Sequence, residues 1–426
     1  MQERRDVDYS ATHDFAREMD RNDPLARFRE QYHLPRAVGG EPFIYLAGNS
    51  LGLQPKGAWP MIEQELKDWA KFGVEGHFEA KHPWYSYHEM FSQPLATLVG
   101  ADPVEVVAMN TLTTNLHLMM VSFYRPTPDR HKILIEAGAF PSDQYAVAGQ
   151  IRYHGYDPAE GVIELRPRDG EDGVRTEDIE RLLLTRGNEI ALVMLGGVNY
   201  YTGQAFDMER ITAAARAQGC VVGFDLAHAA GNLVLRLHEW DVDFAVWCGY
   251  KYLNSGPGGV SGVFVHQRHA FDPSLPRFAG WWGVEPATRF AMNSEFMPQQ
   301  GAAGWQLSNA QILPMAAHKA ALDLFVEAGM EALRAKSLLL TGYLEFLIDA
   351  IEGKRYAIIT PRDPAQRGCQ LSIRIRGDAR KLSEELKWVG VIADYRAPDV
   401  IRLAPVPMYN TFDDVYRVAH FLARAT

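Results

Sequence analysis

Cysteine is scarce in this chain of 426 residues, which contains only Cys220, Cys248 and Cys369. So few and so widely spaced cysteines exclude a disulfide scaffold and lack the spacing of a metal site, so we expect buried thiols in a reducing compartment and no bound metal. No apolar stretch approaches the roughly 20 residues that span a bilayer, and the first residues, MQERRDVDYS, have no apolar core of the signal-peptide type. We therefore predict a cytoplasmic protein.

Long basic runs are also missing, and the net charge is -10. Without such a run, neither nucleic acid nor an anionic membrane surface is an expected partner, although a local basic pocket for a small anion remains open. A content of 47% hydrophobic and 23% charged residues is typical of a soluble globular protein. The length exceeds what one hydrophobic core usually fills, so we expect two structural domains.

The pattern along the chain changes twice. Residues 1–40 are polar and charged, with a short helix expected in DPLARFRE, and we predict an N-terminal arm. Across 41–310, short apolar runs such as KILIEA and CVVGFDLA alternate with helical patterns such as TEDIERLLLTRG, which predicts a large α/β domain with a mostly parallel sheet. Residues 311–426 begin as a long connecting helix, with Gly329 and Gly342 as candidate breaks, and end in a small α+β domain.

Two charged residues follow predicted strands in the large domain. Asp225 lies in CVVGFDLAHAAGN, and Lys251 lies in WCGYKYLNSGPGG about 25 residues later. Pyridoxal phosphate (PLP) chemistry needs a lysine to hold the aldehyde and an acid to keep the pyridinium nitrogen protonated, so that the ring accepts electrons. Alone, such an Asp is more often a helix cap and such a Lys a surface charge. Their order and context favour the PLP interpretation.

Further polar groups follow other predicted strands, where ligands of open parallel sheets bind. The opening of TLTTNLHLMM has amides and hydroxyls for a phosphate, or it is a plain helix cap. In AFPSDQ, Phe140 is placed to stack on a cofactor ring and Asp143 to reach its nitrogen, although the segment also reads as a turn. His228 shares a helical face with Asp225, and glycines after Lys251 permit close approach, or a strand-to-strand turn.

Two later segments add candidates. FAGWWGVE and WQLSNAQIL supply Trp281 and Asn309, which would line a site or a subunit interface, with core packing equally expected for the tryptophan. Arg402 lies in the strand-like run VIRLAPVP, where burial is costly without an anionic partner. A substrate carboxylate would satisfy it, and so would an ordinary salt bridge.

Eight segments together resemble one family. YLAGNSLGLQP, FPSDQY, YYTGQ, FDLAHAAGN, GYKYLNSGPGG, GWWG, LSNAQIL and IRLAPVPMYN resemble kynureninase motifs, in the family's order. The resemblance implies a PLP-dependent enzyme of the aspartate aminotransferase fold (fold type I), and a homodimer with active sites at the subunit interface. It also implies hydrolysis of L-kynurenine or 3-hydroxy-L-kynurenine to anthranilate or 3-hydroxyanthranilate plus L-alanine, in tryptophan breakdown or NAD synthesis.

The resemblance also implies site residues. Lys251 would be the Schiff-base lysine and Asp225 the pyridinium partner, and we expect Tyr250 to transfer protons in catalysis. Cofactor contacts would come from Leu112, Thr113, Phe140, Pro141, Ser142, Asp143, Asp225, His228, Tyr250, Lys251, Trp281 and Asn309, with Trp281 and Asn309 from the partner subunit.

Substrate binding would involve Arg402 at the carboxylate, and Ser50, His77 and Asn309 near the aromatic group. His82 or His88 stands close enough in sequence to be mistaken for His77. Because His and Asn both hydrogen-bond hydroxyls, the pair slightly favours the 3-hydroxy substrate.

Two other readings stay open. A cysteine desulfurase or an aminotransferase would share the fold, but a desulfurase needs a mobile catalytic cysteine, and Cys220 and Cys248 lie in strand-like runs with Cys369 near a strand start. A noncatalytic binding protein on the same scaffold would be favoured by loss of Lys251 or Asp225, and both are present.

Overall fold

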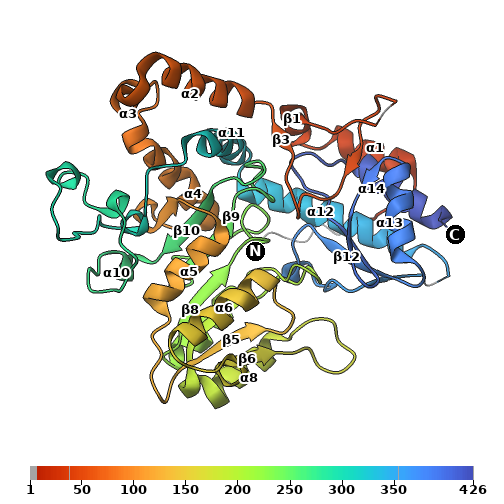
Figure 1. Cartoon of the computed structure of the whole chain (residues 1–426). Coiled ribbons are helices and arrows are strands. Elements are labelled where there is room, and N and C mark those ends of the chain that lie inside the picture. The colour runs from red at the N-terminus through yellow and green to blue at the C-terminus, as the bar shows by residue number, and fades with distance from the viewer. Residues whose placement is uncertain (1–6, 38, 354, 426) are drawn as a thin grey trace.

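A seven-stranded sheet forms the centre of the computed structural model, which describes residues 7–37, 39–353 and 355–425 (Figure 1). The strand order is β4-β10-β9-β8-β7-β5-β6. Strands β9, β8, β7, β5 and β6 are parallel to one another, and β10 runs antiparallel to both β9 and β4. The expected mostly parallel sheet is therefore confirmed. The strands are β4 (Val106–Ala108), β5 (Lys132–Glu136), β6 (Val162–Leu165), β7 (Ile190–Gly196), β8 (Val221–Asp225), β9 (Phe244–Cys248) and β10 (Ser261–Val265).

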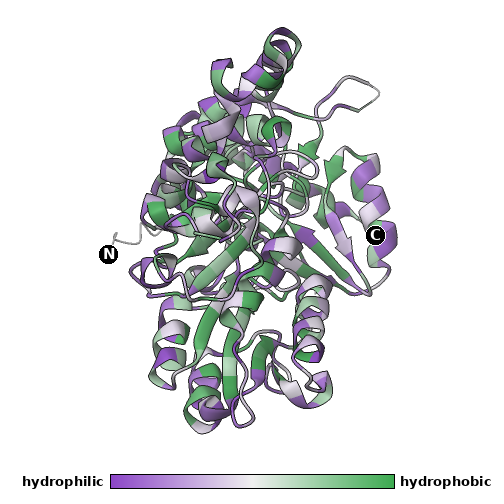
Figure 2. Cartoon of the chain, turned by 60° about the vertical axis from the view of Figure 1, so that its left-hand side comes forward, coloured by the Kyte–Doolittle hydropathy of each residue, from purple (hydrophilic) through white to green (hydrophobic). Residues whose placement is uncertain are grey.

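Apolar side chains on both faces explain why these runs form central strands. Ile133 and Ile135 of β5 pack with helices α5 (Leu112–Phe123) and α6 (Pro141–Tyr153). Leu134 between them packs on the opposite face with α8 (Thr176–Arg186) and α9 (Met208–Ala217). Successive strand residues point to opposite faces, so a continuous apolar run suits a sheet covered by helices on both sides. Figure 2 shows the hydrophobic strands between helices whose outer faces are hydrophilic.

Helices begin where the sequence offers caps. Asp207 accepts a hydrogen bond from the Arg210 amide at the start of α9, and Thr411 and Asp414 form a capping box at the start of α14. None of the described helices is long and apolar enough to cross a membrane. The helices are α1 (His13–Arg21), α2 (Ala58–Phe72), α3 (Gly76–Glu79), α4 (Ser92–Val99), α5 (Leu112–Phe123), α6 (Pro141–Tyr153), α7 (Pro158–Gly161), α8 (Thr176–Arg186), α9 (Met208–Ala217), α10 (Gln267–Ala270), α11 (Ile312–Ala328), α12 (Met330–Asp349), α13 (Ala379–Trp388) and α14 (Phe412–Arg424).

The expected connecting helix is two helices. Gly329, at φ +75°, ends α11 and precedes α12, because glycine adopts this left-handed backbone without steric cost. Helix α11 packs on α2 and α4, whereas α12 packs on α14. Gly342 continues inside α12, where the hydroxyl of Tyr9 lies so close that a Cβ would meet it at 2.5 Å.

The C-terminal part contains a second sheet, in the order β11-β12-β15-β14. Its strands are antiparallel, and α12, α13 and α14 lie around it, on the right of Figure 1. A separate hydrophobic core joins this sheet to these helices. The strands are β11 (Tyr356–Ile358), β12 (Leu371–Ile375), β14 (Asp394–Arg396) and β15 (Val400–Leu403).

N-terminal residues lie against this C-terminal part. The Asp20 carboxylate at the end of α1 accepts hydrogen bonds from the Phe412 amide at 2.7 Å and the Asp413 amide at 3.0 Å. Strand β2 (Ile44–Tyr45) pairs with β13 (Val391–Ile392) in parallel, and β1 (Tyr32–His33) pairs with β3 (Gln54–Pro55). The segment expected as an arm therefore contacts the last helix of the chain, and the domain boundaries at residues 40 and 310 stay predictions.

Candidate active site

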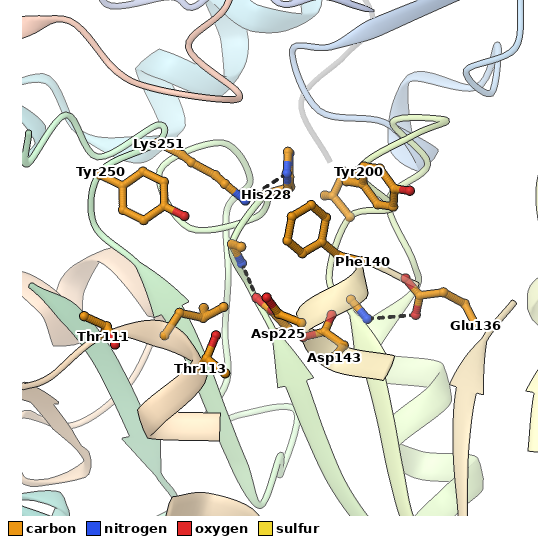
Figure 3. Close-up of a pocket in the computed structure, with 15 residues that line it drawn as sticks. Thr111, Thr113, Glu136, Phe140, Asp143, Tyr200, Asp225, His228, Tyr250 and Lys251 are labelled. Atoms are coloured by element: carbon orange, nitrogen blue, oxygen red, sulfur yellow. Dashed lines mark hydrogen bonds between the residues drawn. The ribbon is translucent and has the colours of Figure 1, made fainter. Parts of the chain in front are cut away.

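A pocket opens beyond the carboxyl ends of β5, β7 and β8, where ligands of parallel sheets bind (Figure 3). Residues from loops and helix starts that follow five strands converge there, so the pocket brings together most of the residues expected from the sequence. The lining residues are Thr111, Leu112, Thr113, Glu136, Phe140, Ser142, Asp143, Gly196, Val198, Tyr200, Asp225, Ala227, His228, Tyr250 and Lys251.

Two buried carboxyl groups lie side by side at the base of the pocket (Figure 3). Asp225 ends β8 and accepts a hydrogen bond from the Ala227 amide at 2.7 Å. Burial raises its pKa, and the positive charge of Lys251 opposes this rise. Asp143, in the first turn of α6, has a pKa raised further by burial and by the negative charge of Asp225. Its Oδ1 atom is buried without a hydrogen-bond partner.

Lys251 enters the pocket from the loop after β9. Its Nζ lies 3.1 Å from Nε2 of His228 and 5.5 Å from the centre of the Phe140 ring. Burial lowers the pKa of His228 well below its usual value, and the charge of Lys251 lowers it further, so the imidazole is neutral at physiological pH. The Nδ1 atom of His228 is buried without a partner.

The loop before α2 fixes the backbone that carries Lys251. The amide of Gly52 donates to the Tyr250 carbonyl at 2.8 Å. A Cβ at Gly52 would lie 2.3 Å from the Lys251 carbonyl oxygen, so only glycine allows this approach. By itself the motif YLAGNSLGLQP indicates only the family resemblance, because the contact of Gly52 with the lysine segment forms in the folded chain.

The start of α5 forms another side of the pocket. Thr111 precedes the helix, yet its hydroxyl makes no capping hydrogen bond and lies 3.2 Å from the Thr114 hydroxyl. Thr111 occupies the N-cap position without a side-chain capping hydrogen bond, so the phosphate-binding role of this motif stays a prediction. The first amides of this twelve-residue helix stay available for an anion, which the helix dipole also favours.

These residues fit PLP. The pyridinium N–H would supply the donor for the buried carboxyl oxygens of Asp143 and Asp225, and Phe140 presents a ring for stacking. Thr111, Leu112 and Thr113 would hold the phosphate at the helix start. Lys251 is the amine within reach of the same space. Acid, lysine, aromatic ring and helix start thus lie around one cavity.

Solved structures share this fold. A C-DES variant with glycine covalently linked to its PLP cofactor has a TM-score of 0.78 and 18% identity, covering 93% of this chain and 99% of its own. A cysteine desulfurase from Escherichia coli has a TM-score of 0.75 and 18% identity, and the match covers 94% of this chain and 98% of the desulfurase. The fold and the pocket together define a PLP-dependent enzyme of fold type I.

Sequence comparison then resolves the family. Residues 333–422 match the kynureninase C-terminal domain model. A kynureninase from Myxococcus xanthus is 60% identical over 95% of both chains, and one from Koribacter versatilis is 58% identical over 97% of this chain and 98% of its own. A kynureninase from Nematostella vectensis is 49% identical over 97% of this chain and 93% of its own. This chain belongs to the kynureninase family.

The remaining expected residues lie outside the pocket lining. Arg402 is buried next to it and donates to the Tyr200 carbonyl at 2.7 Å, and to the Ser50 hydroxyl at 3.1 Å. The structure thus places Ser50 with Arg402, whereas His77 lies 3.4 Å from Asn309. Pro141 is the first residue of α6.

Trp281 is 44% exposed, and its indole N–H donates to the Arg289 carbonyl. The two histidines near His77 in sequence have other surroundings. His82 pairs with Glu65 at 3.2 Å, whereas His88 is buried with a pKa lowered by burial to about 4. His77 alone of the three contacts Asn309 in the part of the chain that the structure describes.

Sequence reasoning missed Glu136 and Tyr200. Glu136 ends β5 and accepts from the Gly196 amide at 3.0 Å, while burial raises its pKa to about 7. Tyr200 packs edge-on against Phe140, with 5.3 Å between the centres of the two rings. A charged residue closing an apolar strand and the tyrosine pair in YYTGQ were the available signals, and neither shows by itself that its side chain faces the pocket.

The three cysteines are buried. Burial raises the pKa of each thiol, to about 12 for Cys369. None of them is the exposed, easily ionised thiol that a desulfurase needs.

Proposed function

We propose that this chain hydrolyses the bond between Cβ and Cγ of L-kynurenine, of 3-hydroxy-L-kynurenine, or of both. The products are anthranilate or 3-hydroxyanthranilate, and L-alanine. The observation that supports this most is the placement of Lys251 and Asp225 in one pocket, beside the buried Arg402, in a chain of the kynureninase family. Bound PLP supplies an electron sink that stabilises negative charge on the substrate carbon attached to the amino group.

Each lining residue then has a role. Lys251 would hold the cofactor through its amine, and the same amine is placed to take the α-proton of the substrate. Asp225, with Asp143 beside it, would keep the ring nitrogen of the cofactor protonated. The neutral imidazole of His228 lies 3.1 Å from the lysine Nζ and leaves the amine without a competing positive charge. Phe140 would stack on the cofactor ring.

Tyr250 is proposed as the group that moves a proton when water adds to the γ-carbonyl. It lines the pocket next to Lys251 (Figure 3). Burial raises its pKa, so the phenol keeps its proton at neutral pH and can act as an acid.

Substrate recognition follows from the residues beside the pocket. Arg402 binds the α-carboxylate, because a buried guanidinium pairs well with a carboxylate. His77 and Asn309 lie 3.4 Å apart and contact the aromatic end, where both can hydrogen-bond a ring hydroxyl. This pair favours the 3-hydroxy substrate.

A homodimer would complete the site. Trp281, His77 and Asn309 do not line the pocket of their own chain, and Trp281 and Asn309 are exposed. A second copy of the chain would bring these residues to the pocket. Mixing Lys251→Ala and Asn309→Ala subunits tests this arrangement, because only hybrid dimers that share sites contain an intact one. Recovery of about a quarter of the wild-type activity is expected for a random mixture. Sites built from one chain would give no recovery.

Turnover on defined substrates tests the activity. Purified protein reconstituted with PLP receives L-kynurenine and 3-hydroxy-L-kynurenine separately, with the aromatic product followed by fluorescence and alanine by an independent assay. Equal amounts of aromatic product and alanine, absent from Lys251→Ala, are expected. A bound cofactor without cleavage of either substrate would overturn the proposal and direct the search to a desulfurase or aminotransferase activity.

A further inference from the structure

A charged cluster lies behind Tyr200 at the edge of the pocket. We call Ser50, Asp394, Arg396 and Arg402 the carboxylate cluster. Asp394 and Arg402 face each other on the antiparallel strands β14 and β15. Nη2 of Arg402 donates to Asp394 Oδ2 and, at 3.1 Å, to the Ser50 hydroxyl, while Nη1 donates to the Tyr200 carbonyl.

One carboxylate serves two guanidinium groups in this cluster. Asp394 Oδ1 lies 3.0 Å from Nε of Arg396, and Oδ2 accepts from Nη2 of Arg396 at 3.1 Å. With Ser50 neutral, two positive charges and one negative charge leave the cluster one positive charge in excess. A cluster with this composition is short of one monovalent anion.

Unused donors point to the same deficit. The Nε atom of Arg402 is buried and makes no hydrogen bond. Of the five N–H groups of Arg402, three have partners in Ser50, Asp394 and Tyr200. Buried guanidinium donors normally find an acceptor, so a further acceptor is expected here.

The excess positive charge reaches the reaction centre. The charges of Arg402 and Arg396 both lower the pKa of His228, after the larger effects of burial and Lys251. Tyr200 links the cluster to the pocket directly, because its carbonyl binds Arg402 and its ring packs against Phe140. An anion at the cluster would therefore lie beside the bound cofactor.

We infer that Arg396 is a second cationic residue of the site for the amino-acid carboxylate, and that Asp394 sets the net charge of this site to that of one carboxylate. This inference rests on the proposed function and names two residues that it did not use. The site then selects amino acids with a single α-carboxylate, since a second carboxylate would meet no remaining positive charge.

A series of variants with different cluster charge tests the inference. Arg396→Gln lowers the net charge to zero, and the partly exposed side chain makes the substitution mild. Asp394→Asn keeps the shape and an acceptor oxygen, and raises the net charge to two. Asp399→Asn is the control, because Asp399 lies on the same hairpin, near Arg374, outside the cluster. Thermal unfolding confirms that each variant is folded.

The readout is ligand binding to the holoenzyme, followed by the cofactor's visible absorbance. L-Alanine carries the carboxylate, and L-alaninamide replaces it by a neutral amide. We expect the Kd of alanine to rise about tenfold in Arg396→Gln and to fall about tenfold in Asp394→Asn. This is the order of magnitude for gaining or losing one unit charge near a bound carboxylate in a partly solvated site. The Kd of alaninamide should change little in either variant.

Each other result overturns the inference. An unchanged ratio of the two Kd values in Arg396→Gln would make Arg396 an ordinary surface salt-bridge residue. Weaker alanine binding by Asp394→Asn would make Asp394 an anchor for Arg402 instead of a counter-charge. If Asp394→Asn does not fold, the Arg396→Gln comparison decides alone. The measurement needs no kynurenine cleavage, so failure of the proposed function and failure of this inference remain distinguishable.

Discussion

Gly52 is where a small steric change should reach Lys251, the proposed cofactor-binding lysine. A Cβ added there would lie 2.3 Å from the Lys251 carbonyl oxygen, and 2.2 Å from Oδ1 and 2.8 Å from Cα of Asn254. Two of these atoms belong to the backbone, and Asn254 is buried, so no flexible side chain can move aside. Gly52→Ala therefore has to displace the segment that carries Lys251.

The size of the effect follows from the displacement. Overpacking of a buried site costs about 1 to 3 kcal/mol of stability. Relief of the clash requires a shift of roughly 1 Å, and a misplacement of that size at a reacting group lowers the rate about 100-fold. We therefore expect Gly52→Ala to lower kcat by one to two orders of magnitude and to lower the melting temperature.

The assay compares kcat, PLP affinity and thermal unfolding in Gly52→Ala, Gly57→Ala and the wild type. Gly57 is the matched control, since its Cβ would meet only Ala320 Cβ at 3.4 Å, an ordinary contact. Its variant should stay within about twofold of the wild type in kcat. Wild-type kcat and PLP affinity in Gly52→Ala would refute the argument that this contact positions Lys251.

Three further predictions concern groups of the pocket and the buried thiols. Burial raises the pKa of Glu136 from 4.5 to about 7, so between these values the folded apoprotein holds a proton that the unfolded chain has released, and stability falls as the pH rises. The loss of unfolding free energy reaches at most about 3 kcal/mol above pH 7. Urea unfolding at pH 5 and pH 8 should show a weaker pH dependence in Glu136→Gln than in the wild type. An equal pH dependence in the two proteins would contradict this origin. Tyr250→Phe should lower kcat about 100-fold or more with little change in PLP affinity, as absorbance titration can measure, and unchanged turnover would remove Tyr250 from the mechanism. Because burial raises the pKa of all three thiols, iodoacetamide at pH 7.5 should leave the native holoenzyme active, and Cys248→Ala should keep turnover; rapid inactivation would show an accessible thiol.

Much of the architecture can be predicted from local patterns. Continuous apolar runs such as Ile190–Gly196 indicate strands buried on both faces, and periodic segments such as Met208–Ala217 indicate covering helices. The order of Asp225 and Lys251 along the chain points to the cofactor, because strand ends of a parallel sheet meet at one edge. These inferences need only residues that are near one another in sequence, or the general geometry of such sheets.

Other features depend on contacts that no local pattern records. Gly52 touches the Lys251 backbone across about 200 residues of chain, and the two-residue strand β2 has a partner only because β13 lies beside it. Gly329 ends α11 and so interrupts the expected connecting helix, whereas Gly342 lies inside the packed helix α12 and does not interrupt it. From the sequence, both glycines are only candidate breaks of that helix.

The carboxylate cluster shows the same division. The resemblance implied a carboxylate site at Arg402 and placed Ser50 at the aromatic end, while the folded chain puts the Ser50 hydroxyl on Arg402 and lets Asp394 serve two arginines. Residue types and order along the chain determine which chemistry is available. The tertiary structure decides the net charge of a site, which donors stay unpaired, and the pKa of a buried carboxyl such as Glu136. These properties depend on burial and on charges that the fold brings together from distant segments.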